Sequence, residues 1–232
     1  LRMSDLHGVL SDIDAVIHSA GRAHIMDEKA QDPLAEFLKL NRDVTVNLAD
    51  LAASNGVKRF IYISSIKVLG ECTDDQPPYS VISEANPSDP YAVSKLEAEI
   101  GLKKLREKQG LEIVIIRPPL VYGAGVKGNF EKLLNLVKYP IPLPFGSIHN
   151  SRSMVSVENL VDLIGRCLWH PNAVNETFLV SDGENLSTPD LISLIATTGG
   201  YKVKMFNVPL RLLKFASMCL GKSALYDRLC RS

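Results

Sequence analysis

The sequence predicts an α/β fold in which helices cover both faces of a parallel sheet. Three short apolar runs, at residues 14–20, 58–65 and 111–117, are rich in β-branched residues, as strands buried on both faces are. Helical patterns at 34–54 and 90–109 separate them. Strands that alternate with helices pair in parallel through crossover connections, so the pattern predicts a doubly wound sheet.

The helices between these strands have start and stop signals. Apolar residues recur near a 3.6-residue period over 34–54, and Asn55–Gly56 supplies the end of that helix. Asp89 followed by Pro90 begins the next helix, because Asp is favoured as N-cap and Pro at the first helical position. This helix is expected to run to about Gln109–Gly110. The polar, Pro-rich residues 71–89 predict a long loop, and such loops often carry function.

After about residue 120 the regular alternation loosens, which predicts a smaller lobe packed on the sheet domain. We expect the sheet domain over residues 1–122 and a C-terminally incomplete substrate lobe over 123–232. Further elements are expected as helices at 128–138, 158–169, 188–198 and 208–220 and as a strand at 176–181. A Pro-rich stretch, a polar loop and Ser153–Val157 separate the first two of these helices.

The composition excludes several classes of protein. Lys plus Arg and Asp plus Glu both number 26, so the zero net charge argues against nucleic-acid binding through a basic field. With 46% hydrophobic and 22% charged residues the chain is globular, and no apolar run reaches the ~20 residues of a membrane span. Four cysteines without paired spacing and five histidines in no ligand motif predict reduced thiols in the cytoplasm and no metal site.

A glycine-rich segment at 123–128 (GAGVKG) matches the GxGxxG pattern of dinucleotide-binding loops. The pattern has that meaning directly after a strand, with an acidic residue ~20 positions further on. Five residues separate the segment from Arg117, and residues 132–157 contain no Asp or Glu. We therefore interpret it as a flexible loop on the substrate side.

Tyr91 and Lys95 form the pair best suited to proton transfer. They are four residues apart, so they share one face of the predicted helix near its positive end. A phenol with its ordinary pKa of ~10 is a poor base, but a nearby ammonium or a cationic nicotinamide ring favours the phenolate. Such a Tyr can move a proton to or from a sugar hydroxyl while a hydride passes to a cofactor. Taken alone, the spacing also fits an ordinary surface pair.

Two serines strengthen this interpretation. Ser64 and Ser65 stand at the carboxyl end of a predicted parallel strand, where open α/β sheets bind ligands. Ser65 precedes Tyr91 by 26 residues, one crossover unit, so both side chains can face the same cleft. The alternative is that the serines merely end the strand.

In this order the motifs resemble the extended short-chain dehydrogenase/reductases that act on nucleotide sugars, especially bacterial UDP-sugar 4-epimerases and related reductases. The matching segments cover nearly the whole chain: DAVIHSAG (14–21), NRDVTVNLADLAA with Asn41 and Thr45, KRFIYISSIKVLG (58–70), PYAVSK (90–95), RPPLVYG (117–123) and RSMVSVENL (152–160). The resemblance implies a Rossmann-type sheet domain followed by a small substrate lobe.

The resemblance also implies roles for single residues. Tyr91 is the catalytic base, Lys95 its partner that also holds the nicotinamide ribose, and Ser65 the catalytic hydroxyl beside the C4 oxygen of the sugar. The remaining cofactor contacts are Ala20, Gly21, Asn41, Ser64 and Pro118. The remaining substrate contacts are Asn129 near the diphosphate or sugar, Phe145 beside the uracil, and Arg152, whose guanidinium suits a diphosphate.

Three departures from the family pattern bear on these expectations. Leu69 stands where many members have Tyr, and Leu120 where many epimerases have a substrate-binding Asn. The first βαβ unit of the family, with its pyrophosphate loop and ribose-binding acid, is absent before Leu1, and the segment that completes the substrate lobe is absent after Ser232. We therefore expect the chain to be a piece of a longer protein.

The activity implied by the resemblance is NAD-dependent epimerisation at C4 of a UDP-hexose of the UDP-glucose or UDP-N-acetylglucosamine type, through a transient 4-keto sugar. NADP remains open as the cofactor, and surface-polysaccharide synthesis is the expected role. The alternatives are an NAD(P)H-dependent 4-keto-sugar reductase and, in another class, a non-catalytic dinucleotide-binding protein. A dehydratase is disfavoured because Ile66–Lys67 follows Ser65 where dehydratases usually have Asp-Glu. A homodimer through the Tyr91 helix and the helix before it is expected, with Leu96 and Leu102 at the interface or in the core.

Overall fold

The computed structural model describes residues 8–23, 31–74, 76–126 and 128–232, except for the side chains of Asn129 and Ala224. The chain divides into two compact units. Unit 1 comprises Leu1–Glu71, Tyr79–Pro119 and Val155–Val180, and unit 2 comprises Cys72–Pro78, Leu120–Met154 and Ser181–Ser232.

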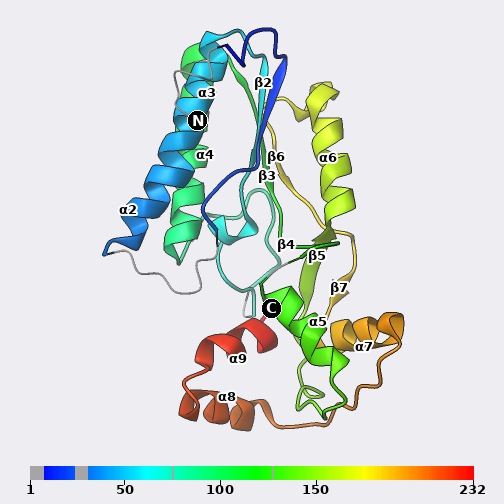
Figure 1. The fold of residues 1–232 in the computed structure, drawn as a ribbon. Coiled ribbons are helices and arrows are strands. Elements are labelled where there is room, and N and C mark those ends of the chain that lie inside the picture. The colour runs from blue at the N-terminus through cyan, green and yellow to red at the C-terminus, as the bar shows by residue number, and fades with distance from the viewer. Residues whose placement is uncertain (1–7, 24–30, 75, 127) are drawn as a thin grey trace. The chain divides into compact units, whose positions relative to one another are not determined.

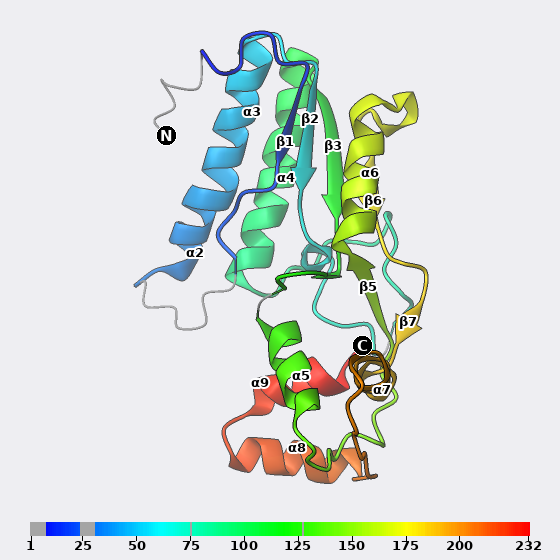
Figure 2. The ribbon, with the colours of Figure 1, turned by 45° about the vertical axis from the view of Figure 1, so that its right-hand side comes forward.

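Unit 1 is built on a four-stranded sheet whose strands all run parallel, in the order β1-β2-β3-β6. The strands are β1 (Ala15–His18), β2 (Arg59–Ile63), β3 (Glu112–Arg117) and β6 (Thr177–Leu179). Almost every residue of β2 and β3 is buried, as expected for strands covered on both faces. The parallel register and the side-by-side strands in Figure 2 confirm the predicted sheet.

Helices lie on both faces of this sheet (Figure 1). One face carries α2 (Pro33–Phe37), a π-helical segment η1 (Leu38–Asp43), α3 (Val44–Ser54) and α4 (Pro90–Gln109), and the other carries α6 (Val157–Trp169). The core between α3, α4 and the sheet is apolar and includes Ala49, Ala52, Phe60, Tyr62, Ala98, Leu102, Ile113 and Ile115. Burial of Leu102 places this residue in the core rather than at an interface.

The helix expected over 34–54 is present, with one difference. Leu38–Asp43 is π-helical, so each backbone N–H there bonds a carbonyl five residues back instead of four. The apolar spacing did not indicate this change, because a widened turn alters the period only locally. The segment contains Asn41, which is almost fully buried. Such insertions often occur at functional sites.

The predicted boundary at residue 122 differs from the structure over residues 155–180. This segment contains α6 and β6, and β6 pairs in parallel with β3, so the segment extends the main sheet. A parallel neighbour needs a crossover connection, and α6 supplies it. The short turns η2 (Ile66–Val68) and η3 (Pro171–Ala173) complete the elements of unit 1.

Unit 2 contains a second sheet, ordered β4-β5-β7, and several short helices. Its elements are β4 (Leu120–Tyr122), α5 (Asn129–Lys138), β5 (Arg152–Ser156, the first three residues in this unit), β7 (Asn185–Leu186), α7 (Thr188–Gly199), α8 (Leu210–Cys219) and α9 (Ser223–Cys230). Val137 of α5 and Ile192 of α7 are fully buried in its core. The described residues of the glycine-rich segment, 123–126 and 128, lie between β4 and α5 and belong to no strand of the parallel sheet.

Candidate active site

The carboxyl ends of β2 and β3 bring together two of the predicted site segments. Beyond β2, the backbone N–H of Ser64 donates to the carbonyl of Ile116 at 2.7 Å, and that of Ile66 donates to the carbonyl of Pro118 at 3.0 Å. These hydrogen bonds continue the parallel pairing past the strand ends. The segment containing Ser65 therefore runs beside Pro118, at the edge of the sheet where the sequence predicts the site.

Ser65 is the N-cap of the turn η2. Its hydroxyl accepts a hydrogen bond from the backbone N–H of Lys67 at 3.3 Å, and its side chain lies close enough to Tyr91 to lower the pKa of that phenol. The structure thus brings together two of the three residues expected to be catalytic. This contact joins the end of β2 to the first turn of α4.

Tyr91 is positioned by the start of α4. Asp89 accepts a hydrogen bond from the backbone N–H of Ala92 at 2.7 Å, which caps the helix and fixes its first turn. The Tyr91 ring meets the ring of Phe37 edge-on, with 6.2 Å between ring centres. Burial raises the pKa of the Tyr91 phenol. The nearby Ser65 hydroxyl and the charge of Lys67 lower this pKa, and the charge of Asp89 raises it.

Lys95 lies one helical turn after Tyr91 and is only 4% exposed. Its Nζ donates to the carbonyl of Ile63 at 2.9 Å and lies 4.8 Å from the ring centre of Tyr62 and 5.9 Å from that of Tyr91. Burial lowers the pKa of Lys95 to about 8, while the nearby carboxylate of Glu99 opposes this change. The ammonium and the phenol are therefore neighbours, and burial favours the neutral form of each.

A buried ion pair supports the site from behind, and the sequence interpretation missed it. Arg117 donates to both oxygens of Glu99, at 3.0 and 2.6 Å, and the hydroxyl of Ser64 donates to Glu99 at 2.5 Å. All three side chains are buried. The available signal was the spacing, since Glu99 is four residues after Lys95 and Arg117 directly precedes Pro118. The Ser64 hydroxyl thus binds a structural carboxylate, whereas the sequence predicts only a contact of Ser64 with the cofactor.

Asn41 and Gly21 meet Lys95 at the carboxyl end of β1. The Asn41 amide accepts from the backbone N–H of Arg22 at 2.7 Å and donates to the Arg22 carbonyl at 3.0 Å and to the Ser94 hydroxyl at 2.9 Å. A Cβ on Gly21 would lie 3.1 Å from Asn41 Oδ1 and 3.3 Å from Lys95 Nζ. The exposed backbone at 20–21 therefore runs directly over two buried polar groups.

This arrangement fits a nicotinamide cofactor. Residues 20–21 are exposed, so a ligand can reach the backbone, and Gly21 has no side chain to displace the Lys95 ammonium below it. The ammonium can donate to ribose hydroxyls because it has three N–H groups. Ala20, Gly21, Asn41, Ser64, Lys95 and Pro118 all belong to unit 1, near the carboxyl ends of β1, β2 and β3.

His18 and Thr45 extend the buried polar groups near Lys95. His18 Nε2 lies 2.9 Å from the Thr45 hydroxyl, which donates to the carbonyl of Asn41 at 2.6 Å, so the imidazole N–H is the donor in the first contact. The imidazole stacks on the Tyr62 ring at 6.0 Å. Burial, and secondarily the Lys95 charge, lowers the pKa of His18 to about 4. His18 is therefore neutral at physiological pH.

The expected substrate residues other than Ser65 belong to unit 2. The guanidinium of Arg152 donates to the carbonyl of Arg231 at 2.9 and 2.8 Å and to that of Asp227 at 3.5 Å, so it holds the end of α9. Phe145 packs against the core of unit 2. Asn129 is the first residue of α5, and its side chain lies outside the described part of the structure.

The described residues offer neither a metal site nor a membrane-spanning helix. No group of three or more His, Cys, Asp or Glu side chains is arranged to hold a metal ion there. Within the same residues, no helix has both the length and the apolar character needed to cross a membrane. The four cysteines carry free thiols.

Known proteins resemble this chain in sequence and in structure. The NAD dependent epimerase/dehydratase family matches residues 1–181. A UDP-glucose 4-epimerase of Vibrio cholerae is 46% identical over 227 residues, which span 97% of this chain and 69% of that protein. A GDP-6-deoxy-D-mannose reductase of Pseudomonas aeruginosa is 29% identical over 208 residues, spanning 86% and 67%. The structure of RMD from Pseudomonas aeruginosa complexed with NADPH has a TM-score of 0.73 and 27% identity, covering 87% of this chain and 73% of that one. This likeness confirms the predicted fold class.

Proposed function

The chain belongs to the NAD dependent epimerase/dehydratase family, and on that premise we propose that it interconverts the C4 epimers of a UDP-hexose. The family match confirms the enzyme type and the nicotinamide cofactor expected from the sequence. A substrate of the UDP-glucose or UDP-N-acetylglucosamine type, used for surface-polysaccharide synthesis, is the finer part of the proposal. The 46% identity to a UDP-glucose 4-epimerase supports a substrate of this type.

The observation that carries the proposal is the meeting of Ser65, Tyr91 and Lys95 at the carboxyl edge of the parallel sheet. Ser65 lies close enough to Tyr91 to lower the pKa of its phenol, and the Lys95 ammonium lies 5.9 Å from the Tyr91 ring centre. A hydroxyl, a phenol and a cation at a ligand-binding edge can bind an alcohol oxygen and exchange its proton. A protein that only binds a dinucleotide has no need of all three, so this arrangement favours an enzyme.

The chemistry divides between the cofactor and these side chains. Bound NAD, held by the residues at the carboxyl ends of β1, β2 and β3, would supply the acceptor for a hydride from C4 of the sugar and the means to return it to the opposite face. As the hydride leaves, the Tyr91 phenolate takes the proton of the C4 hydroxyl, which leaves a 4-keto sugar that can turn over in the site. Tyr91 then returns the same proton to the oxygen, so atoms and charge balance. Ser65 holds that oxygen, and the Lys95 ammonium favours the phenolate.

A dehydratase fits this site less well. Lys67 stands where dehydratases usually carry an acidic residue, and two carboxylates, Asp89 at 2.7 Å and Glu71 at 2.9 Å, hold its ammonium. These partners raise the pKa of Lys67 despite its partial burial. A firmly held ammonium is a poor general acid or base near neutral pH.

A one-way 4-keto-sugar reductase is the second candidate. The 29% identity to a reductase of Pseudomonas aeruginosa favours keeping it. Such an enzyme would use the same Ser65, Tyr91 and Lys95 set to give a proton to a 4-keto sugar. The two candidates differ in whether reduced cofactor is consumed.

Unit 2 is proposed to hold the nucleotide part of the substrate. Phe145 would lie beside the uracil, Asn129 near the diphosphate or sugar, and Arg152 on the diphosphate. Arg152 has five N–H donors, so it can bind phosphate oxygens in addition to the carbonyls that it already contacts. The free thiols agree with the proposed cytoplasmic location, where cysteines stay reduced.

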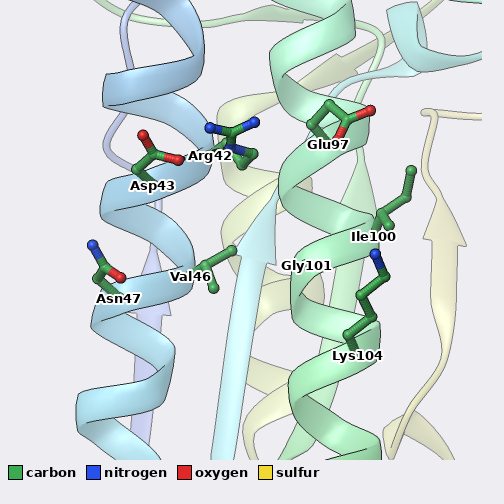
Figure 3. A pocket seen from close by; sticks show the side chains of 8 residues that line it. All are labelled: Arg42, Asp43, Val46, Asn47, Glu97, Ile100, Gly101 and Lys104. Carbon is green, nitrogen blue, oxygen red and sulfur yellow. Dashed lines mark hydrogen bonds and ion pairs between the residues drawn. The ribbon is translucent and has the colours of Figure 1, made fainter.

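We also propose a homodimer formed through α3 and α4. These helices and the end of η1 line a groove of about 450 Å³ (Figure 3), whose residues are Arg42, Asp43, Val46, Asn47, Glu97, Ile100, Gly101 and Lys104. Ile100 is exposed, as is Val44 on the neighbouring helix. The groove mixes both signs of charge with apolar side chains, which suits pairing with a second copy. Sedimentation velocity with an Ile100→Glu variant tests this, and an unchanged sedimentation coefficient contradicts it.

The activity is tested by incubating the full-length protein with UDP-glucose or UDP-N-acetylglucosamine and NAD. Epimerisation predicts that the C4 epimer of one of these sugars forms without net accumulation of NADH. If no epimer forms but a 4-keto nucleotide sugar is reduced while NAD(P)H is consumed, the reductase is correct instead. Nucleotide-sugar analysis by anion-exchange chromatography, with absorbance at 340 nm for the cofactor, separates these results.

A further inference from the structure

Lys67 connects the two segments that carry Ser65 and Tyr91. Its Nζ donates to Asp89 Oδ2 at 2.7 Å, and the other oxygen of Asp89 caps α4 by accepting from the backbone N–H of Ala92 at 2.7 Å. One carboxylate therefore binds the Lys67 side chain and the first turn of the helix that contains Tyr91.

The backbone of Lys67 binds the other segment. Its N–H donates to the Ser65 hydroxyl at 3.3 Å, within the turn η2 that follows β2. Lys67 thus contacts Ser65 through its main chain and the start of α4 through its side chain. These contacts hold the turn of Ser65 beside the first turn of α4, which contains Tyr91.

The charged and titratable groups around Tyr91 come from three elements. Lys67 comes from η2, Asp89 and Lys95 from α4 and its cap, and Tyr62 from β2. The neighbour on α2 is the uncharged Phe37. Of the two cations, Lys95 is buried and has a pKa of about 8, whereas two carboxylates raise the pKa of Lys67. Lys67 is therefore the cation that stays charged throughout the neutral and mildly alkaline range.

We propose that Lys67 is a positioning residue, which fixes the Ser65 turn against the first turn of α4 and presents a permanent positive charge to the Tyr91 phenol. This inference rests on the proposed role of Tyr91 in proton transfer. It assigns to Lys67 a task that the Tyr91 and Lys95 motif alone does not include.

The test measures the pKa of Tyr91 by NMR titration and compares the parent protein with Lys67 variants. The full-length protein is loaded with NAD and labelled with ¹³C at tyrosine Cζ, and Tyr91→Phe assigns the signal. Lys67→Met should move the ionisation of Tyr91 upward by about one pKa unit, the size expected for a partly screened charge. Lys67→Arg should restore most of the parent value. Lys58→Met is the matched control, because Lys58 pairs with Asp14 at 3.5 Å on the surface. The same Tyr91 pKa in Lys67→Met and in Lys58→Met would overturn the proposal.

A second variant separates the charge from general damage to the fold. Asp89→Asn keeps an oxygen that can cap α4 but removes a negative charge that raises the Tyr91 pKa. It should therefore lower the pKa of Tyr91, opposite to the effect of Lys67→Met, whereas a purely structural role would change the pKa in the same direction in both variants.

The turnover of Lys67→Met gives an independent readout. Its kcat should fall, and the acidic limb of its pH–kcat profile should move to higher pH, with KM for the nucleotide sugar little changed. If Tyr91→Phe retains full turnover, the proposed function fails, and the NMR titration still decides whether Lys67 acts on the phenol.

Discussion

Burial favours the neutral forms of Tyr91 and Lys95, because it raises the pKa of the phenol and lowers the pKa of the ammonium. Removing the phenol oxygen while keeping the ring isolates the part of catalysis that depends on proton transfer. Tyr91→Phe should lower kcat by ~10²–10⁴ and leave nucleotide-sugar affinity nearly unchanged. The matched control is Tyr139→Phe, because Tyr139 is 63% exposed. Steady-state kinetics with isothermal titration calorimetry measure both quantities, and near-parent turnover would refute the acid–base role.

His18 makes stability depend on pH. Below pH 6.5 the unfolded chain binds a proton at this residue, whereas the folded chain does so only near its lowered pKa of about 4. Stability is therefore lost as the pH falls from 6.5 to 4, by up to about 3 kcal/mol from this residue. His18→Gln lacks this titration, so urea unfolding at a series of pH values should show a shallower loss for the variant. The exposed residue His149 offers a control, and a His18→Gln slope equal to that of His149→Gln would contradict the assignment.

At the scale of the element, the start of α4 combines stability with function. Asp89→Ala removes the cap and the Lys67 ion pair, so the free energy of unfolding should fall by about 1–2 kcal/mol and kcat should fall as well. Asp32 caps α2 by accepting from the Ala35 N–H at 3.0 Å, without that ion pair. Asp32→Ala should therefore lower stability but retain kcat. Equal kcat values for the two variants, measured beside urea unfolding, would show that the α4 cap has no special role.

Two helical glycines should respond to the same substitution with opposite signs. A Cβ on Gly101 would lie 2.5 Å from Val46 Cγ2 across the α3–α4 contact, and valine in a helix has one strongly preferred rotamer. Gly101→Ala should therefore destabilise unit 1 by roughly 1–2 kcal/mol. On α6, Gly165 has open space at the Cβ position, so Gly165→Ala should stabilise the protein by about 0.5–1 kcal/mol. Thermal unfolding of both variants tests this, and a stabilised Gly101→Ala would mean that Val46 moves away at little cost.

The elements that sequence could predict are those with local signals. β2 and β3 are continuous apolar runs, and α4 has its cap at Asp89 and its left-handed stop at Gly110 written in the sequence. The π-helical segment 38–43 and the short strands β4 and β7 depend on contacts with distant residues, so no local pattern indicated them. The sequence pattern places residues 155–180 in the lobe, because the pairing of β6 with β3 joins segments far apart in the chain and has no local signal.

At the scale of the whole molecule, the candidate site is predictable only where a motif marks it. Ser65, Tyr91 and Lys95 could be found because their order and spacing resemble a known family. The spacing of Glu99 and Arg117 relative to Lys95 and Pro118 was a weaker signal, since charged residues in a helix and at a strand end ordinarily face solvent. The packed structure shows both side chains buried and paired.

The central claim is that one hydride leaves C4 of the sugar and returns to the same carbon while Tyr91 handles the proton. The most direct measurement uses UDP-hexose deuterated at C4, incubated with the full-length protein and NAD, and follows the label in both epimers by NMR and mass spectrometry. The account predicts that the new epimer keeps deuterium at C4 and that, in D₂O, unlabelled sugar gains none at carbon. Loss of the label to solvent, or conversion of a 4-keto sugar with consumption of NAD(P)H and no epimer, would contradict it.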